Sequence, residues 1–207
     1  MMMILLVDDG HLMNRYFDFH FHKDVVTIFP GEFYTCDGKE LISTVLGSCI
    51  AVTIFDQRLK TGGMNHFMLA YCNDYEKKTP DCYGRFGIYA MELLINDLLK
   101  KGSKKEDLVA KVFGGSNVLS TDGKYKGALI GETNSKFAFK YLEDEGIPVL
   151  SSNTGGVLPR KIFYDASSSK VWLKHIRSDV QALKKMELSY LDRLHEQEKT
   201  VGEVQLF

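Results

Sequence analysis

Two short apolar runs separated by a tight turn place the strongest constraint on the fold. The runs are residues 41–46 and 50–55, and the turn between them is Gly47-Ser48-Cys49. Both runs are rich in β-branched residues, which are enriched in strands. A turn between two strands lies at the end of a sheet. We therefore expect two strands here, with the thiol of Cys49 facing a cleft at the sheet end.

A histidine follows this turn at a spacing that suits a catalytic pair. Residues 56–63 supply turn residues, and residues 64–69 predict a third strand that carries His66 near its start. A cysteine becomes a nucleophile as its thiolate, and a nearby histidine promotes that form. Adjacent strands can bring Cys49 and His66 together.

A third residue usually orients the histidine of such a pair. The hydroxyls available just before the turn are Ser43 and Thr44. Neighbouring residues of a strand point to opposite faces, so only one of the two can face His66. The sequence leaves both candidates open.

A purely structural role for Cys49 and His66 is the alternative. The chain has four cysteines and six histidines, so some pair falls within twenty residues by chance. Cysteine is also among the most frequently buried residue types. On composition alone, a core cysteine beside a hydrogen-bonded core histidine is the more frequent case.

Several ordered sequence blocks change this weighting. They are the turn at residues 46–49, the segment Gly-Gly-Met-Asn-His-Phe-Met-Leu at 62–69, and later blocks at 83–91, 111–115, 131–134 and 153–160. Together they resemble the chemoreceptor glutamine deamidases, the CheD family of bacterial chemotaxis, from about residue 16 to residue 176. The resemblance implies that Cys49 is the nucleophile and His66 its base, with Thr44 or Ser43 as the third member.

The resemblance also implies an activity and its partners. The expected reaction converts glutamine side chains on methyl-accepting chemotaxis receptors to glutamate and releases ammonia. The backbone around Gly47 and Ser48 would hold the oxyanion, and no metal or organic cofactor is needed. The expected substrate partner is the cytoplasmic helices of chemoreceptors, and the phosphatase CheC is a candidate second partner. The alternatives are a non-catalytic regulatory partner of receptors or of CheC, and a cysteine peptidase.

Charge and hydropathy exclude other classes. The 26 Lys and Arg residues nearly balance the 27 Asp and Glu residues, so nucleic acid is an unexpected partner. No apolar run has the roughly 18 to 20 residues of a membrane-spanning helix, and the apolar start runs into Asp8-Asp9. We expect a cytoplasmic protein without membrane insertion. The four cysteines show no Cys-x-x-Cys spacing, which favours free thiols over a disulfide or a zinc site.

The order of predicted elements indicates an α+β fold, a single-domain layered α/β sandwich with mixed β-sheets as in the CheD family. We expect an N-terminal arm at residues 1–24, the deamidase domain at 25–177, and a C-terminal helix and tail at 178–207. Within the domain, helices are expected at about 83–101 and 135–145, and Trp172 in the core. The tail helix carries one narrow apolar stripe, which either packs on the domain or docks with a partner.

Overall fold

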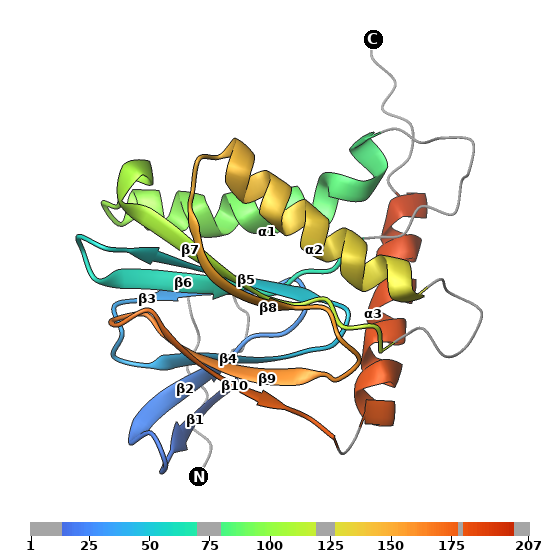
Figure 1. The fold of residues 1–207 in the computed structure, drawn as a ribbon, viewed down its shortest axis with the longest axis horizontal. Helices are drawn as coiled ribbons and strands as arrows, with labels where there is room; N and C mark the ends of the chain where they lie inside the picture. The colour runs from blue at the N-terminus through green and yellow to red at the C-terminus, as the bar shows by residue number, and fades with distance from the viewer. Residues whose placement is uncertain (1–13, 70–79, 119–126, 178–179, 201–207) are drawn as a thin grey trace.

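The computed structural model describes residues 14–69, 80–118, 127–177 and 180–200 (Figure 1). Its strands are β1 (Asn14–Asp18), β2 (Lys23–Thr27), β3 (Phe33–Cys36), β4 (Leu41–Leu46), β5 (Ile50–Asp56), β6 (Thr61–Asn65), β7 (Leu108–Gly114), β8 (Val149–Thr154), β9 (Arg160–Asp165) and β10 (Lys170–His175). The helices are α1 (Pro80–Lys100), the short 3₁₀ helix η1 (Lys105–Asp107), α2 (Gly127–Asp144) and α3 (Val180–Thr200).

The described strands form two mixed sheets of five strands each. The first has the order β1-β2-β4-β9-β10, and the second has the order β3-β6-β5-β7-β8. Most neighbours are antiparallel, and each sheet contains one parallel pair, β2 with β4 and β7 with β8. The predicted α+β class with mixed sheets is confirmed.

The two sheets and two of the helices stack in layers around two cores. The sheets face each other, and α1 and α2 cover the outer face of the second sheet (Figure 1). Strand β5 serves both cores because successive side chains of a strand point to opposite faces. Cys49 and Ala51 lie in the core between the sheets, whereas Ile50 and Val52 lie in the core under the helices.

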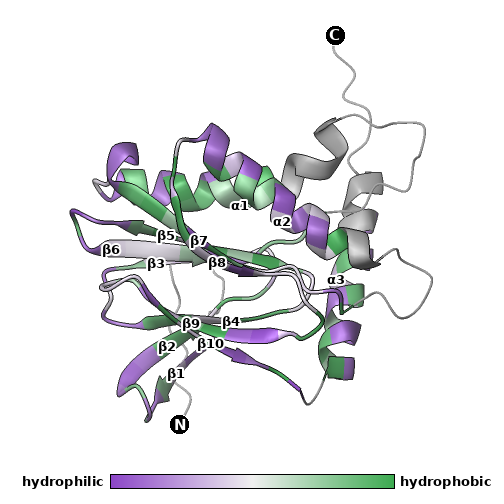
Figure 2. Ribbon diagram, viewed as in Figure 1, coloured by the Kyte–Doolittle hydropathy of each residue, from purple (hydrophilic) through white to green (hydrophobic). Residues whose placement is uncertain are grey.

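Helix α3 lies at one end of the stack, beside the strand ends of both sheets (Figure 1). Hydrophilic and hydrophobic positions are mixed along its length (Figure 2). Leu191 of α3 is fully buried in the core between the sheets, so this helix packs on the domain. None of the helices in the described ranges combines the length and hydropathy needed to cross a bilayer.

Several boundaries differ from those expected. Helix α2 begins at Gly127, ahead of the expected position 135. Strand β1 forms within the segment expected to be an arm, because it pairs antiparallel with β2 at the edge of the first sheet. Trp172, expected in the core, is 39% exposed on β10 and contacts the ring of Phe21. The apolar start of the chain lies outside the described residues.

Candidate active site

The turn Gly47-Ser48-Cys49 carries the chain from β4 in the first sheet to β5 in the second. Its residues therefore lie where the two sheets meet at one end of the stack. A Cβ at Gly47 would lie 2.5 Å from Oε1 of Glu187 and 2.8 Å from Cγ2 of Val118. A larger residue at this position would therefore have to displace the side chains of Glu187 and Val118.

The carbonyl groups of Gly47, Ser48 and Cys49 all accept hydrogen bonds from the segment at the end of β7 or from α2. Gly47 O accepts hydrogen bonds from Ser116 N at 2.7 Å and Ser116 Oγ at 2.8 Å. Ser48 O accepts from Asn134 Nδ2 at 2.8 Å, and Cys49 O accepts from Gly115 N at 2.8 Å. Peptide groups have their N–H and C=O on opposite sides, so these contacts direct the N–H groups of the turn away from them.

The glycines at the end of β7 allow these hydrogen bonds to form. Gly114 and Gly115 have φ values of 113° and 67°, in the left-handed region that disfavours residues with a Cβ. A Cβ on Gly114 would collide with Cys49 O, and one on Gly115 would collide with Ser135 Oγ. Glycine at both positions therefore allows this segment to approach the Cys49 turn closely.

Strand parity decides which hydroxyl meets His66. Thr44 faces the space between the sheets, on the same side of β4 as Ile42 and Leu46, which belong to the core there. Thr44 Oγ1 lies 2.7 Å from His66 Nδ1. Ser43 faces the other side, and its buried Oγ has no hydrogen-bond partner among the described residues. Of the two candidates, the structure brings Thr44 to His66.

The hydrogen bonds of Thr44 also fix the tautomer of His66. Thr44 Oγ1 donates its only hydrogen to Ile28 O at 2.8 Å. It must then accept at His66, so Nδ1 carries the imidazole proton. His66 Nε2 is left with a lone pair, and it is a buried atom without a hydrogen-bond partner in the described part of the chain. The ring is therefore set up as a base at Nε2.

The pairing of β5 with the segment after β6 places Cys49 and His66 on one face. Ile50 and Phe67 exchange two backbone hydrogen bonds of 2.9 Å and form a bridge. In this register Ala51 is opposite His66, and Cys49 shares the face of Ala51. Residues in this diagonal relation lie roughly 7–8 Å apart between backbones, a spacing within reach of an imidazole ring.

Cys49 and His66 are closed off from solvent. Cys49 is fully buried and His66 is 2% exposed. Burial lowers the pKa of His66 from 6.5 to about 3, partly opposed by a hydrogen bond to the Ile28 carbonyl. Burial also raises the pKa of the Cys49 thiol, and the negative charge and hydrogen bond of Glu187 raise it further. In the resting structure the thiol of Cys49 and the imidazole of His66 are therefore both neutral.

Glu187 of α3 binds directly to the N–H groups of the Cys49 turn. Its Oε1 accepts from Gly47 N at 3.0 Å and from Cys49 N at 3.5 Å. Its Oε2 accepts from Ser48 N at 3.0 Å and from Ser48 Oγ at 2.8 Å. Burial raises the pKa of Glu187, and these hydrogen bonds oppose the rise. Three convergent backbone N–H groups form a nest for an anion, and the carboxylate of Glu187 occupies it.

Glu187 is the site residue that sequence reasoning missed. It lies 138 residues or more from the turn in the chain. A signal was present, because position 187 falls four residues after Leu183 and four before Leu191 on the apolar stripe. A carboxylate on such a stripe indicates a buried partner. Asn134, which the sequence placed only within the block at 131–134, also contacts the Cys49 turn.

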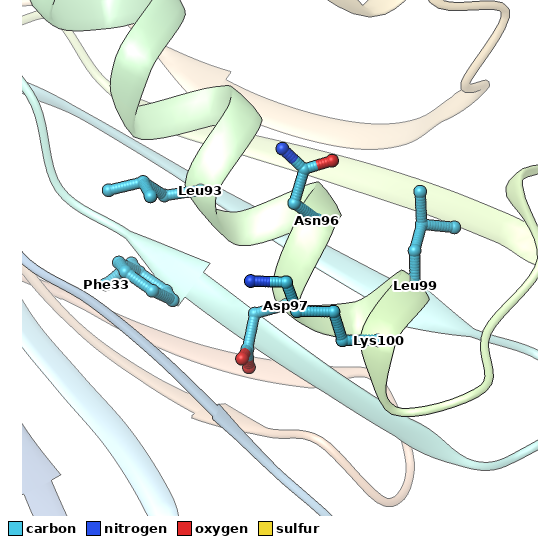
Figure 3. Close-up of a pocket in the computed structure, with 6 residues that line it drawn as sticks. All are labelled: Phe33, Leu93, Asn96, Asp97, Leu99 and Lys100. Atoms are coloured by element: carbon cyan, nitrogen blue, oxygen red, sulfur yellow. The ribbon is translucent and has the colours of Figure 1, made fainter. Parts of the chain in front are cut away.

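Two other features of the described residues bear on the choice of this site. These residues contain no group of three His, Cys, Asp or Glu side chains placed to hold a metal ion. One surface pocket lies between α1 and β3 and is lined by Phe33, Leu93, Asn96, Asp97, Leu99 and Lys100 (Figure 3). It includes neither Cys49 nor His66. The arrangement at the turn can support a nucleophile, a base, and a site for a developing oxyanion.

Comparison with known proteins adds independent information. The family described as CheD chemotactic sensory transduction matches residues 68–175. A probable chemoreceptor glutamine deamidase CheD from Methylobacillus flagellatus is 42% identical over 203 residues, 97% of this chain and 98% of that protein. A protein of the same name from Janthinobacterium sp. is 40% identical over 98% of both chains. Another from Vibrio vulnificus is 37% identical over 94% of this chain and 92% of its own.

Proposed function

The chain belongs to the CheD family, and on that premise we propose that it is a protein-glutamine deamidase of bacterial chemotaxis. Its substrates are selected glutamine side chains on the cytoplasmic helices of methyl-accepting chemotaxis receptors. Its products are glutamate side chains and ammonia. Cys49 is the nucleophile, His66 is the general base and acid, and Thr44 is the residue that positions His66.

The observation that carries this proposal is the side chain of Glu187 on the Cys49 turn. Glutamine has the same shape as glutamate, with an amide group in place of the carboxylate. The hydrogen bonds of Glu187 therefore support a binding mode in which a helix-borne glutamine reaches the nest of Gly47, Ser48 and Cys49. Full burial of Cys49 in this structure is compatible with that reach, because a side chain of the required length already extends to the turn.

The first half of the reaction transfers the side-chain acyl group to sulfur. His66 Nε2 takes the proton of the Cys49 thiol, and the thiolate attacks the amide carbon of glutamine. The carbonyl oxygen becomes an oxyanion, which the N–H groups of the turn stabilise. The imidazolium then gives its proton to the amide nitrogen, the C–N bond breaks, and ammonia leaves. Thr44 accepts the hydrogen bond from Nδ1 throughout and keeps the ring oriented.

The second half hydrolyses the thioester. His66 Nε2 takes a proton from water, and the resulting hydroxide equivalent attacks the thioester carbon. The same nest holds the second oxyanion. The C–S bond breaks, the sulfur of Cys49 regains its proton from His66, and the product is a glutamate side chain. Substrate binding must precede these steps, since the resting thiol and imidazole are both neutral.

The receptor helices set the expected location and partners. Their cytoplasmic segments require the enzyme to act in the cytoplasm. The family resemblance also supports the phosphatase CheC as a regulatory partner, which would contact the protein without itself being deamidated.

The test is deamidation of a purified receptor cytoplasmic fragment. Each converted glutamine raises the fragment mass by about one dalton, because an amide nitrogen is replaced by a hydroxyl oxygen. We expect this gain with the native protein and none with Cys49→Ala. Cys36→Ala is the matched control, since Cys36 is a second buried free cysteine, and it should retain activity.

Two results would contradict the proposal. Equal mass gain with native protein and Cys49→Ala would exclude Cys49 as the nucleophile. An unchanged receptor fragment with the native protein would favour the non-catalytic role. Shorter receptor fragments on a gel would instead indicate a cysteine peptidase.

A further inference from the structure

Helix α3 buries charged residues on the face that it turns to the domain. The buried positions among its described side chains are Lys184, Glu187 and Leu191, with exposed fractions of 7%, 3% and 0%. They follow the spacing of one helix face. Burying a carboxylate is unfavourable unless hydrogen bonds compensate for lost water. The Cys49 turn supplies that compensation to Glu187 through three backbone N–H groups and one hydroxyl.

The nest is also held by contacts that lie outside α3. Its carbonyl groups are held by Ser116, Gly115 and Asn134, which belong to the loop after β7 and to α2. None of these contacts involves α3, so they give a reason to expect the turn to keep its shape without that helix. The N–H groups of the turn would then face an open site of unchanged geometry, suited to a carboxamide oxygen or an oxyanion.

Beside Glu187, α3 also contacts the domain through apolar side chains. Leu191 lies in the core between the sheets, and Leu188 and Tyr190 pack against that core from partly buried positions. Other positions of the helix, such as Lys185 and Met186, are exposed to solvent. A helix that docks through a short apolar stripe, a carboxylate on the Cys49 turn and the buried Lys184 can be replaced by another helix that offers equivalent groups.

We propose that α3 occupies the binding site of the substrate helix and that Glu187 holds the position of the target glutamine. This inference rests on the proposed function and specifies its substrate site and its regulation. The enzyme is autoinhibited by an internal helix whose side chain matches the reaction product. A receptor helix enters only when α3 leaves, and it then places its glutamine on the Cys49 turn.

Two consequences follow from this competition. Cys49 is unreactive while Glu187 is bound, because the thiol is buried next to a carboxylate that raises its pKa. The apparent affinity for the receptor is also reduced by the fraction of molecules in which α3 has left. Weakening the hold of Glu187 should increase both thiol reactivity and turnover of the receptor.

The test compares alkylation of Cys49 by iodoacetamide in full-length variants, with the labelled peptides measured by mass spectrometry. Glu187→Ala should be labelled at Cys49 about tenfold faster or more, because the site opens and the thiolate forms more readily. Asp192→Ala, which removes an exposed carboxylate of the same helix, should label like the native protein. Labelling of the buried Cys36 serves as the reference for global unfolding and should not change.

A second measurement separates this inference from the proposed function. Glu187→Ala should raise kcat/KM for the receptor fragment, while Asp192→Ala leaves it unchanged. Equal labelling of Cys49 in all three proteins would overturn the inference. Faster labelling with a lower kcat/KM would also overturn it, since Glu187 would then help to form the site. Faster labelling with no deamidation by any variant would refute the proposed function. It would leave only the conclusion that α3 shields Cys49 from solvent.

Discussion

At the scale of single residues, one threonine determines what His66 can do. Thr44 Oγ1 donates its hydrogen to Ile28 O and so accepts the hydrogen bond from His66 Nδ1. The neighbouring hydroxyl of Ser43 points to the opposite face of β4 and makes no hydrogen bond in the described part of the chain. The sequence narrowed the choice to these two residues. The choice between them depends on which face of β4 is turned toward the second sheet. That orientation is known only once the packing of the two sheets is known.

Replacing Thr44 should therefore impair catalysis more than it impairs folding. We expect Thr44→Val to lower kcat for receptor deamidation by about ten- to a hundredfold, because the imidazole loses its orientation and its preferred tautomer. Thr44→Ser keeps the hydroxyl and should restore most of the rate. Ser43→Ala is the neighbouring control and should stay within about twofold of the native rate. Comparable losses in Ser43→Ala and Thr44→Val would refute this role.

At the scale of elements, α2 and the loop after β7 hold the Cys49 turn in place. Asn134 of α2 donates to Ser48 O and accepts from Leu69 N at 3.0 Å, which ties the turn to the segment that follows His66. It is completely buried. Its side chain thus fixes the Cys49 turn relative to the segment that carries His66.

Loss of the Asn134 amide should loosen the Cys49 turn and the segment that carries His66 together. Asn134→Ala leaves a buried carbonyl and a buried N–H without partners, and we expect about 2–4 kcal/mol less stability in urea unfolding. We also expect kcat to fall by about tenfold because the turn and His66 lose their common anchor. Asn96→Ala on α1, an exposed amide, is the control and should be near neutral. Native-like kcat in Asn134→Ala would contradict the anchoring role.

The elements themselves were largely predictable, and their ends were less so. Helix α1 was expected from its apolar spacing. Five of its residues pack in the core under the helices: Ala90, Met91, Leu94, Ile95 and Leu98. The start of α2 was placed too late. Gly131 resembles a turn residue in sequence, but here its missing Cβ lets the helix approach the carbonyl of Gly115. Tertiary contact outweighed local propensity at that point.

At the scale of the whole molecule, the site exists because two sheets and a terminal helix meet at one end of the stack. Thr44 comes from the first sheet, His66 follows a strand of the second, and Glu187 comes from α3. The sequence predicted the mixed α+β fold, which is confirmed, and the pair of Cys49 and His66, which stays a prediction that the strand register is consistent with. It could not predict the pairing of β4 with β9 or the docking of α3, since both join segments more than 100 residues apart.

Burial of His66 between the sheets should make the free energy of unfolding fall at acidic pH. Its folded-state pKa of about 3 lies below the ordinary value of 6.5, so the unfolded chain binds the proton more strongly. The stability contributed by neutral His66 is full above 6.5 and is lost as the pH falls toward 3. Between about pH 7.5 and about pH 5.5 the native protein should lose about 1.4 kcal/mol that His66→Gln does not lose.

Urea unfolding at the two pH values measures this difference. His20→Gln, which removes an exposed histidine, should follow the native protein. If native protein and His66→Gln lose equal stability on acidification, then His66 does not bear the depressed pKa.

The most direct measurement of the central claim is the mass of the peptide that contains position 187 in purified Glu187→Gln protein. This variant places a glutamine on the Cys49 turn without any receptor. We predict that the introduced glutamine converts to glutamate, with a gain of about one dalton, and that Glu187→Gln combined with Cys49→Ala keeps its glutamine. An unchanged glutamine in both proteins, or equal conversion in both, would contradict the account of Cys49 as a nucleophile aimed at a helix-borne glutamine.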